Sequence, residues 1–107
     1  MIKINNNEMI KGVKYEFEAK PWRYNGPNGW YFISLPIDFS NEIRQNFKSE
    51  EEGWGRLKAN AKIGETEWKT AIWFETKSNT YLLPLKAEVR KNEAIELGVG
   101  VAVIVWI

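Results

Sequence analysis

Two passages of this sequence end an apolar run at a Leu-Pro pair and then change at once to a charged, helix-favouring segment. The first is YFISLPIDFSNEIRQ, residues 31–45, and the second is YLLPLKAEVRKNEAI, residues 81–95. Proline removes a backbone donor and fixes its own φ, so central strand pairing is disfavoured where it occurs. Each passage therefore predicts a strand that leaves its sheet and continues as a short helix.

The two passages also predict a repeated architecture. Each helix contains Glu, a β-branched residue and Arg in succession, at 42–44 and at 88–90, although the first passage has two more residues between its proline and its arginine. A short helix after each strand covers an open barrel end with its apolar side chains. The predicted fold is mainly β, a pseudo-symmetric antiparallel β-barrel with two short capping helices.

Alternating apolar and polar residues place the other elements. The expected strands are residues 13–20, 30–35, 57–63, 66–74, 81–83 and 101–107, and the expected helices are residues 40–48 and 86–92. Ser40 is the expected N-cap of the first helix. Residues 21–29, which are rich in Pro, Gly and Asn, are expected to form a hairpin loop. The expected core consists of Phe17, Phe32, Leu57, Ala59, Ile63, Ile72, Val89, Val101, Val103 and Val105.

Length and composition are those of one globular domain. The chain has 107 residues, of which 44% are hydrophobic and 27% charged, so residues 1–107 are expected to fold as a single β-barrel domain with a sizeable core. Residues 1–12, MIKINNNEMIKG, contain little apolar area and are expected to be flexible or to add an edge strand.

Residue types argue against an enzyme. The chain has no His and no Cys, and Asp38 is its only aspartate, which excludes serine and cysteine triads and His-ligated metals. The carboxylates of SEEEG, residues 49–53, are neighbours in a loop and are not expected to converge on one point. The sequence therefore predicts no catalytic residue, no metal site and no cofactor.

Location and assembly are inferred from what the sequence lacks. The longest apolar run, VGVAVIVWI at residues 99–107, is far shorter than the roughly 20 residues that span a bilayer as a helix. The first residues contain no continuous apolar run of the kind found in secretory signals. A cytoplasmic, non-membrane protein that is a monomer or a weak dimer is the expectation.

Aromatic residues around the predicted loop are candidates for binding a partner. Trp22, Tyr24 and Trp30 flank the Pro- and Gly-rich segment, Trp54 begins a predicted strand, and Trp73 faces away from the predicted core. Aromatic side chains in such positions favour contacts with a protein, a peptide or a small apolar ligand. The alternative is that the same rings pack over the barrel ends as part of the core.

Basic residues support a second hypothesis, nucleic-acid binding. Lys86, Arg90 and Lys91 share the second predicted helix, but several Glu residues lie between and beyond them. Arg56, Lys58 and Lys62 lie on one face of a predicted strand and could extend such a patch. The net charge of +1 gives no overall attraction to phosphate.

Three stretches of the chain carry a resemblance to a known family: GWYFISLPIDFSNEIR, WGRLKANAKIG and YLLPLKAEVRKNEAIELG. Through them the chain resembles a bacterial and archaeal domain-of-unknown-function family with a double-split β-barrel fold. The resemblance runs from about Val13 to Ile107. It implies that the fold is related to AbrB- and MazE-like DNA-binding barrels, with both halves in one chain. Some members of that family also carry a bacteriocin-protection type domain, for which this chain has no room. Gly98-Val99 stands where many members have Gly-Asp, and the resemblance implies no particular activity.

Overall fold

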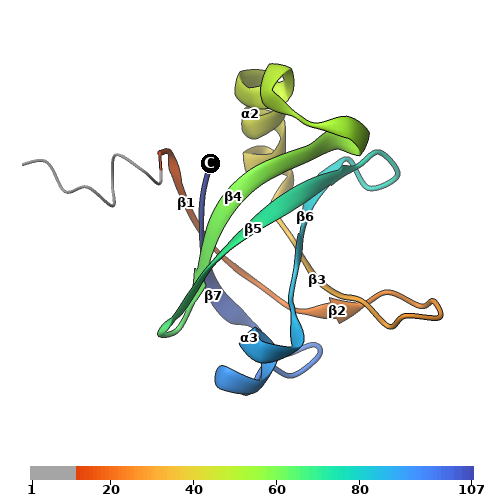
Figure 1. Cartoon of the computed structure of the whole chain (residues 1–107), viewed down its shortest axis with the longest axis vertical. Helices are drawn as coiled ribbons and strands as arrows, with labels where there is room; N and C mark the ends of the chain where they lie inside the picture. The colour runs from red at the N-terminus through yellow and green to blue at the C-terminus, as the bar shows by residue number, and fades with distance from the viewer. Residues whose placement is uncertain (1–11) are drawn as a thin grey trace, which may run out of the picture.

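The computed structural model describes residues 12–107, so the expectation for residues 1–11 lies outside the described residues. One curled antiparallel sheet and two helices make up most of the domain (Figure 1). The elements in chain order are β1 (Lys14–Ala19), β2 (Trp22–Arg23), β3 (Tyr31–Ser34), α2 (Ile37–Phe47), β4 (Arg56–Ile63), β5 (Thr66–Glu75), β6 (Thr80–Pro84), α3 (Ala87–Asn92) and β7 (Val101–Trp106). Two 3₁₀ turns, Lys48–Glu50 and Gly53–Gly55, connect α2 to β4.

The order of the strands requires the sheet to curl. The seven strands lie in the order β1-β7-β4-β5-β6-β3-β2, so β1 and β2 occupy opposite edges. Only Lys20 and Pro21 separate these two edge strands in the sequence. Because the three residue steps from Ala19 to Trp22 span at most about 10 to 11 Å, the edges must approach each other where β1 ends and β2 begins. The result is a half-barrel, which confirms the mainly β, barrel-like prediction in its coarse form.

The two helices lie at opposite ends of the half-barrel (Figure 1). In α2, Phe39, Ile43 and Phe47 recur at a spacing of four, which directs them to one side of the helix. Within residues 12–107 no helix has the length and apolar character needed to cross a bilayer.

The predicted role of Ser40 as an N-cap is wrong, because α2 begins at Ile37, directly after Pro36. Ser40 is instead buried inside the helix. Its hydroxyl lies 3.5 Å from the carbonyl of Leu35, to which it donates, and it accepts the backbone N–H of Tyr81 at 3.0 Å. The residue therefore connects α2 to β3 and β6.

The two strand-helix passages form reciprocal contacts. The N–H of Leu35 donates to the carbonyl of Tyr81 (2.9 Å), and the N–H of Leu85 donates to the carbonyl of Tyr31 (2.8 Å). The two Leu-Pro pairs do not occupy equivalent positions in the two passages. Pro36 lies between β3 and α2, whereas Pro84 is the last residue of β6. Tyr31 and Leu35 instead correspond to Tyr81 and Leu85.

The core lies on the concave face of the sheet. The prediction of Phe32 as a core residue is wrong, because it alternates with the core residue Ile33 and is buried on the opposite face of the sheet. Most of the other predicted core residues are buried in the core, but Phe17 and Val101 are only partly buried and pack at its edge. Both lie on the edge pair β1 and β7, where fewer neighbours cover them. The core also includes residues that were not predicted, among them Tyr15, Leu35, Ile43, Tyr81 and Leu83.

The segment 21–29 is not a simple loop. Trp22 and Arg23 form β2 and pair with Phe32 and Tyr31 of β3, so the turn itself is shorter than expected. The backbone N–H of Tyr24 donates to the carbonyl of Trp30 (2.7 Å) and closes this turn. Extended backbone at 22–23 is compatible with Pro21, whose fixed φ suits a strand start.

We expect a chain that ends at Gly98, and therefore lacks β7, not to fold. β7 lies between β1 and β4, and its Val103 and Val105 are almost completely buried. Burying these two side chains contributes about 3 to 6 kcal/mol, a large share of the roughly 5 to 15 kcal/mol that stabilises a typical domain. Thermal unfolding followed by circular dichroism tests this expectation, and a cooperative transition in the truncated chain would contradict it.

Candidate binding site

Four aromatic rings form a cluster on the outer face of the sheet. Phe32 and Trp73 alternate along their strands with the core residues Ile33 and Ile72, so they point away from the core. The rings of Trp30 and Phe32 are stacked at 6.2 Å between centroids, and Trp30 lies 5.7 Å from Trp73. The cluster thus brings predicted binding residues from three separate segments together.

Trp22 completes the cluster and is held in place by it. Its ring centroid lies 5.2 Å from that of Phe32, and its Nε1 donates to Ser34 Oγ at 2.9 Å. Trp30 is 45% exposed and Tyr24 is 53% exposed. Tyr24 lies in the turn and makes no ring contact with the cluster within residues 12–107. Trp22 therefore has a packing role, whereas Trp30 and Tyr24 present accessible surface.

Trp54 is the aromatic residue most accessible to a partner, and its position differs from the prediction. It does not begin a strand; it lies in the 3₁₀ turn Gly53–Gly55, before β4. Its side chain is 99% exposed, and its backbone has φ 68, in the left-handed region. A bulky residue in this region is an outlier. The signal in the sequence was the Gly-Trp-Gly motif, since flanking glycines permit such a turn.

The loop that carries Trp54 is closed at its base by Glu52 and Arg56. The N–H of Glu52 donates to the carbonyl of Arg56 (2.6 Å), and the N–H of Arg56 donates to the carbonyl of Glu52 (3.0 Å). Their side chains also form an ion pair at 3.0 Å. Gly55 has φ 72, and a Cβ there would lie 3.1 Å from the Cβ of Phe74. The loop therefore lies close against β5.

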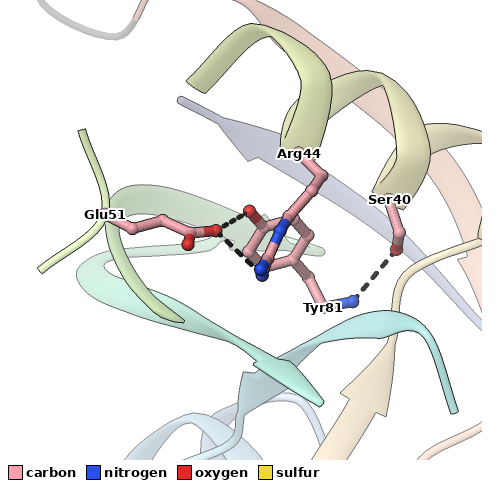
Figure 2. Close-up of polar contacts among 4 residues, drawn as sticks. All are labelled: Ser40, Arg44, Glu51 and Tyr81. Atoms are coloured by element: carbon pink, nitrogen blue, oxygen red, sulfur yellow. Dashed lines mark hydrogen bonds and ion pairs between the residues drawn. The ribbon is translucent and has the colours of Figure 1, made fainter. Parts of the chain in front are cut away.

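A buried polar cluster holds the segment just before this loop. Glu51 accepts a hydrogen bond from the hydroxyl of Tyr81 and an ion-pair contact from Arg44 Nη1 at 3.4 Å (Figure 2). The guanidinium of Arg44 also lies 3.9 Å from the centre of the Phe74 ring. Burial raises the pKa of Tyr81 well above its usual range; Glu51 raises it further and Arg44 lowers it. This arrangement keeps the Tyr81 hydroxyl protonated and donating.

Two adjoining cavities lie beside the loop, and we refer to them together as the Trp54 cleft. The first, of about 450 Å³, is lined mainly by apolar side chains, including Trp54, Trp73 and Leu82. The second, of about 740 Å³, extends over the outer face of β4 and β5 towards Trp106. Arg56 and Trp73 line both cavities. The cleft therefore has an apolar end beside Trp54 and a more polar remainder.

The polar end of the cleft is lined by cations and by two carboxylates. Arg56, Lys58 and Lys69 line it from β4 and β5, and Glu50 and Glu52 lie at the same cavity. Arg56, Lys58 and Lys62 were predicted to share one face of this strand, and of these Arg56 and Lys58 line the cleft. Lys62 is not among the residues that line it.

The predicted basic helix does not present three available cations. Arg90 packs its guanidinium 3.8 Å from the centre of the Tyr31 ring, and its Nε donates to the carbonyl of Leu85 at 3.1 Å. Lys86 lies 4.0 Å from a carboxylate oxygen of Glu88. Lys91 is exposed on α3. Arg90 therefore acts as part of the packing at this end of the half-barrel.

The chemistry available to the cleft is that of apolar contact, hydrogen bonding and ion pairing. Tyr81 and Glu51 line neither of its cavities. Among residues 12–107, no three His, Cys, Asp or Glu side chains are grouped so that they could hold a metal ion. The cleft can hold a ligand through Trp54 and Trp73 and through the cations on β4 and β5.

We expect alkaline conditions to destabilise the protein through Tyr15 and Tyr81. Burial raises the pKa of Tyr15 to about 12, with a further increase from Glu42, and Tyr81 shifts in the same direction. A tyrosine whose pKa is raised by folding stabilises the folded state fully at pH values below its pKa in the unfolded chain, which is near 10. This stabilisation is lost as the pH rises towards the pKa of the folded state. The free energy of unfolding should fall by up to about 1.4 kcal/mol per pH unit for each tyrosine above about pH 10.

Urea unfolding at a series of alkaline pH values measures this slope. Tyr81→Phe keeps the ring and removes only its ionisable hydroxyl, so the stability of this variant should fall less steeply with pH than that of the natural chain. Equal slopes for the two proteins would show that Tyr81 does not contribute to the pH dependence.

Comparison with known proteins is consistent with the predicted family type. Residues 17–105 match the family model described as Domain of unknown function (DUF1905), a range that runs from within β1 to within β7. No curated protein matches the chain. Because the family model spans well over half of the sequence, this chain belongs to the DUF1905 family.

Proposed function

We propose that this domain is a non-enzymatic binding module whose contact surface is the Trp54 cleft. The observation that carries the proposal is Trp54 itself, a fully exposed ring on a closed loop beside an apolar cavity. Tryptophan is among the residues that contribute most to the energy of protein interfaces. Clefts with apolar walls and a few polar groups are the usual form of ligand sites.

The backbone at Trp54 supports this proposal because it costs stability. A left-handed conformation costs an ordinary L-residue about 1 to 2 kcal/mol, and the exposed ring gains almost no burial in return. Strained conformations of this kind are concentrated at binding and active sites. Closure of the loop by Glu52 and Arg56 also lowers the conformational entropy that binding would otherwise remove.

Binding rather than catalysis is supported by where the polar groups lie. The hydroxyl of Tyr81 and the carboxylate of Glu51 contact each other beneath the loop, and neither lines the cleft. Three other carboxylates do line it. Glu52 is paired with Arg56, Glu75 accepts a hydrogen bond from Ser78, and Glu50 is exposed to solvent. Proton transfer to a ligand needs an acid or base within hydrogen-bond reach of that ligand.

We also propose that the curled sheet is a double-split barrel related to the AbrB- and MazE-like folds. Reciprocal hydrogen bonds of Leu35 with Tyr81 and of Leu85 with Tyr31 support two equivalent halves. The strands that flank the helices pair with their counterparts, β3 with β6 and β4 with β7. In this scheme β1 and β2 together correspond to β5, which pairs with β4 along most of its length and with β6 at its end.

Nucleic-acid binding is the second candidate function. Its support is the set of cations in the cleft, Arg56, Lys58 and Lys69, next to exposed aromatic surface. Stacked bases and phosphates are commonly bound by such combinations. The engagement of Arg90 with Tyr31 weighs against it.

Trp54→Gly is expected to abolish binding while leaving the protein equally stable or more stable. Glycine relieves the left-handed strain of about 1 to 2 kcal/mol but adds about 0.5 to 1 kcal/mol of backbone entropy in the unfolded chain. The net change should lie between no effect and a gain of about 1.5 kcal/mol. Urea unfolding measures stability, and selection from a displayed random-peptide library measures binding.

Trp22→Ala is the matched aromatic control for this experiment. Its ring packs on Phe32 and its Nε1 bonds to Ser34, so the substitution should cost up to about 3 kcal/mol while the folded molecules still select peptides. If Trp54→Gly selects the same peptides as the natural chain with equal affinity, Trp54 has no role in binding and the proposed function fails.

A further inference from the structure

We propose that the Trp54 cleft binds an extended segment of a partner protein in which a large apolar side chain lies close to several carboxylates. This inference rests on the proposed function and adds the chemistry of the partner. It follows from the two ends of the cleft, one of which is apolar and the other cationic.

The apolar end fits a single large side chain. Trp54 forms an exposed wall, and Trp73, Phe74 and Leu82 line the same cavity of about 450 Å³. These residues come from the loop and from two neighbouring strands, β5 and β6, so the partner's side chain would contact several elements. Removal of such a side chain and these rings from water supplies an apolar driving force.

The other end carries cations that lack carboxylate partners. Lys58 and Lys69 lie diagonally across the β4–β5 pair, because Lys58 is opposite Ala71 and Lys69 is opposite Asn60. Within residues 12–107 neither lysine forms an ion pair, whereas the nearby Arg56 is paired with Glu52. Glu50 lines the same cavity, so Lys58, Lys69 and Glu50 together leave a net positive charge beside the paired Arg56 and Glu52. This part of the cleft therefore suits carboxylates.

A further polar group in the cleft has no partner. The Nε1 of Trp73 is buried, and it finds no hydrogen-bond acceptor within the part of the chain that the structure describes. A buried indole N–H normally has an acceptor, and its absence costs free energy. Trp73 lies between the apolar and the cationic parts, since it lines both cavities.

The outer face of the sheet presents side chains to a partner. β4 and β5 pair with each other along their length, whereas β4 pairs with β7 only over residues 60–63 and β5 pairs with β6 only over residues 73–75. Lys58 and Lys69 alternate with core residues along their strands, so their side chains project from this outer face. Contacts of these side chains with carboxylates, together with the apolar cavity, therefore define the partner.

Two other occupants fit the cleft less well. A second copy placed symmetrically on the same face would bring Lys58 and Lys69 of both chains towards each other, and like charges at an interface are unfavourable. A nucleic acid has no apolar side chain for the cavity beside Trp54. Both occupants remain outcomes of the experiment.

Selection of a displayed random-peptide library on the immobilised full chain tests the proposal. The natural chain should enrich peptides with a large apolar residue followed or preceded by two or more acidic residues. The double variant Lys58→Glu and Lys69→Glu should bind these peptides at least about tenfold more weakly, and it should enrich basic residues in their place. A matched control, Lys62→Glu with Lys91→Glu, makes the same change in net charge outside the cavities and should behave as the natural chain does.

Several results would overturn the inference. The inference fails if the enriched peptides lack acidic residues or if no peptide is enriched. It also fails if the double variant Lys58→Glu and Lys69→Glu binds the peptides as tightly as the natural chain does. Binding of single-stranded oligothymidine that is lost in the same variant would identify a nucleic acid instead. A dimer in sedimentation equilibrium that Trp54→Ala dissociates would identify a second copy. If Trp54→Ala abolishes selection but the peptides carry no acidic pattern, the proposed function stands and only the partner's chemistry is wrong.

Discussion

Tyr81 makes more connections between elements of this domain than its position in a short strand would indicate. Its ring is fully buried and packs 5.1 Å from that of Phe74. Its N–H donates to Ser40 of α2, its carbonyl accepts from Leu35 beyond β3, and its hydroxyl donates to Glu51. One residue thus satisfies buried polar groups of a helix, a strand end and a loop. Buried polar networks of this kind are costly when one member is lost.

The site depends on these contacts through a short path along the chain. Glu51, held by Tyr81 and Arg44, is followed directly by Glu52, whose bridge with Arg56 closes the loop around Trp54. An exposed ring that was also mobile would lose much of its binding energy to ordering. The buried network therefore positions a residue that makes no contribution to the core. The proposed role in binding would account for both the stability at the base of the loop and the strain at its tip.

Parts of the site could be predicted from the sequence, and parts could not. The alternation along β5 correctly directed Trp73 away from the core, because side-chain direction in a strand follows from position alone. The same reasoning could not find the packing of Trp22 on Phe32, which depends on the pairing of β2 with β3. Nor could it separate Arg90, which is held against Tyr31, from the other cations of its helix.

The sequence by itself determined that this chain is mainly β, where most strands lie, and that two helices follow strands with Leu-Pro pairs. These properties depend on local rules, namely the alternation of side chains and the backbone restrictions of proline and glycine. Only the tertiary structure decided the strand order, the burial of Glu51 against Tyr81 and the cleft that adjoins Trp54. Each of these depends on contacts between residues far apart in the chain, and no local pattern encodes which distant segments become neighbours.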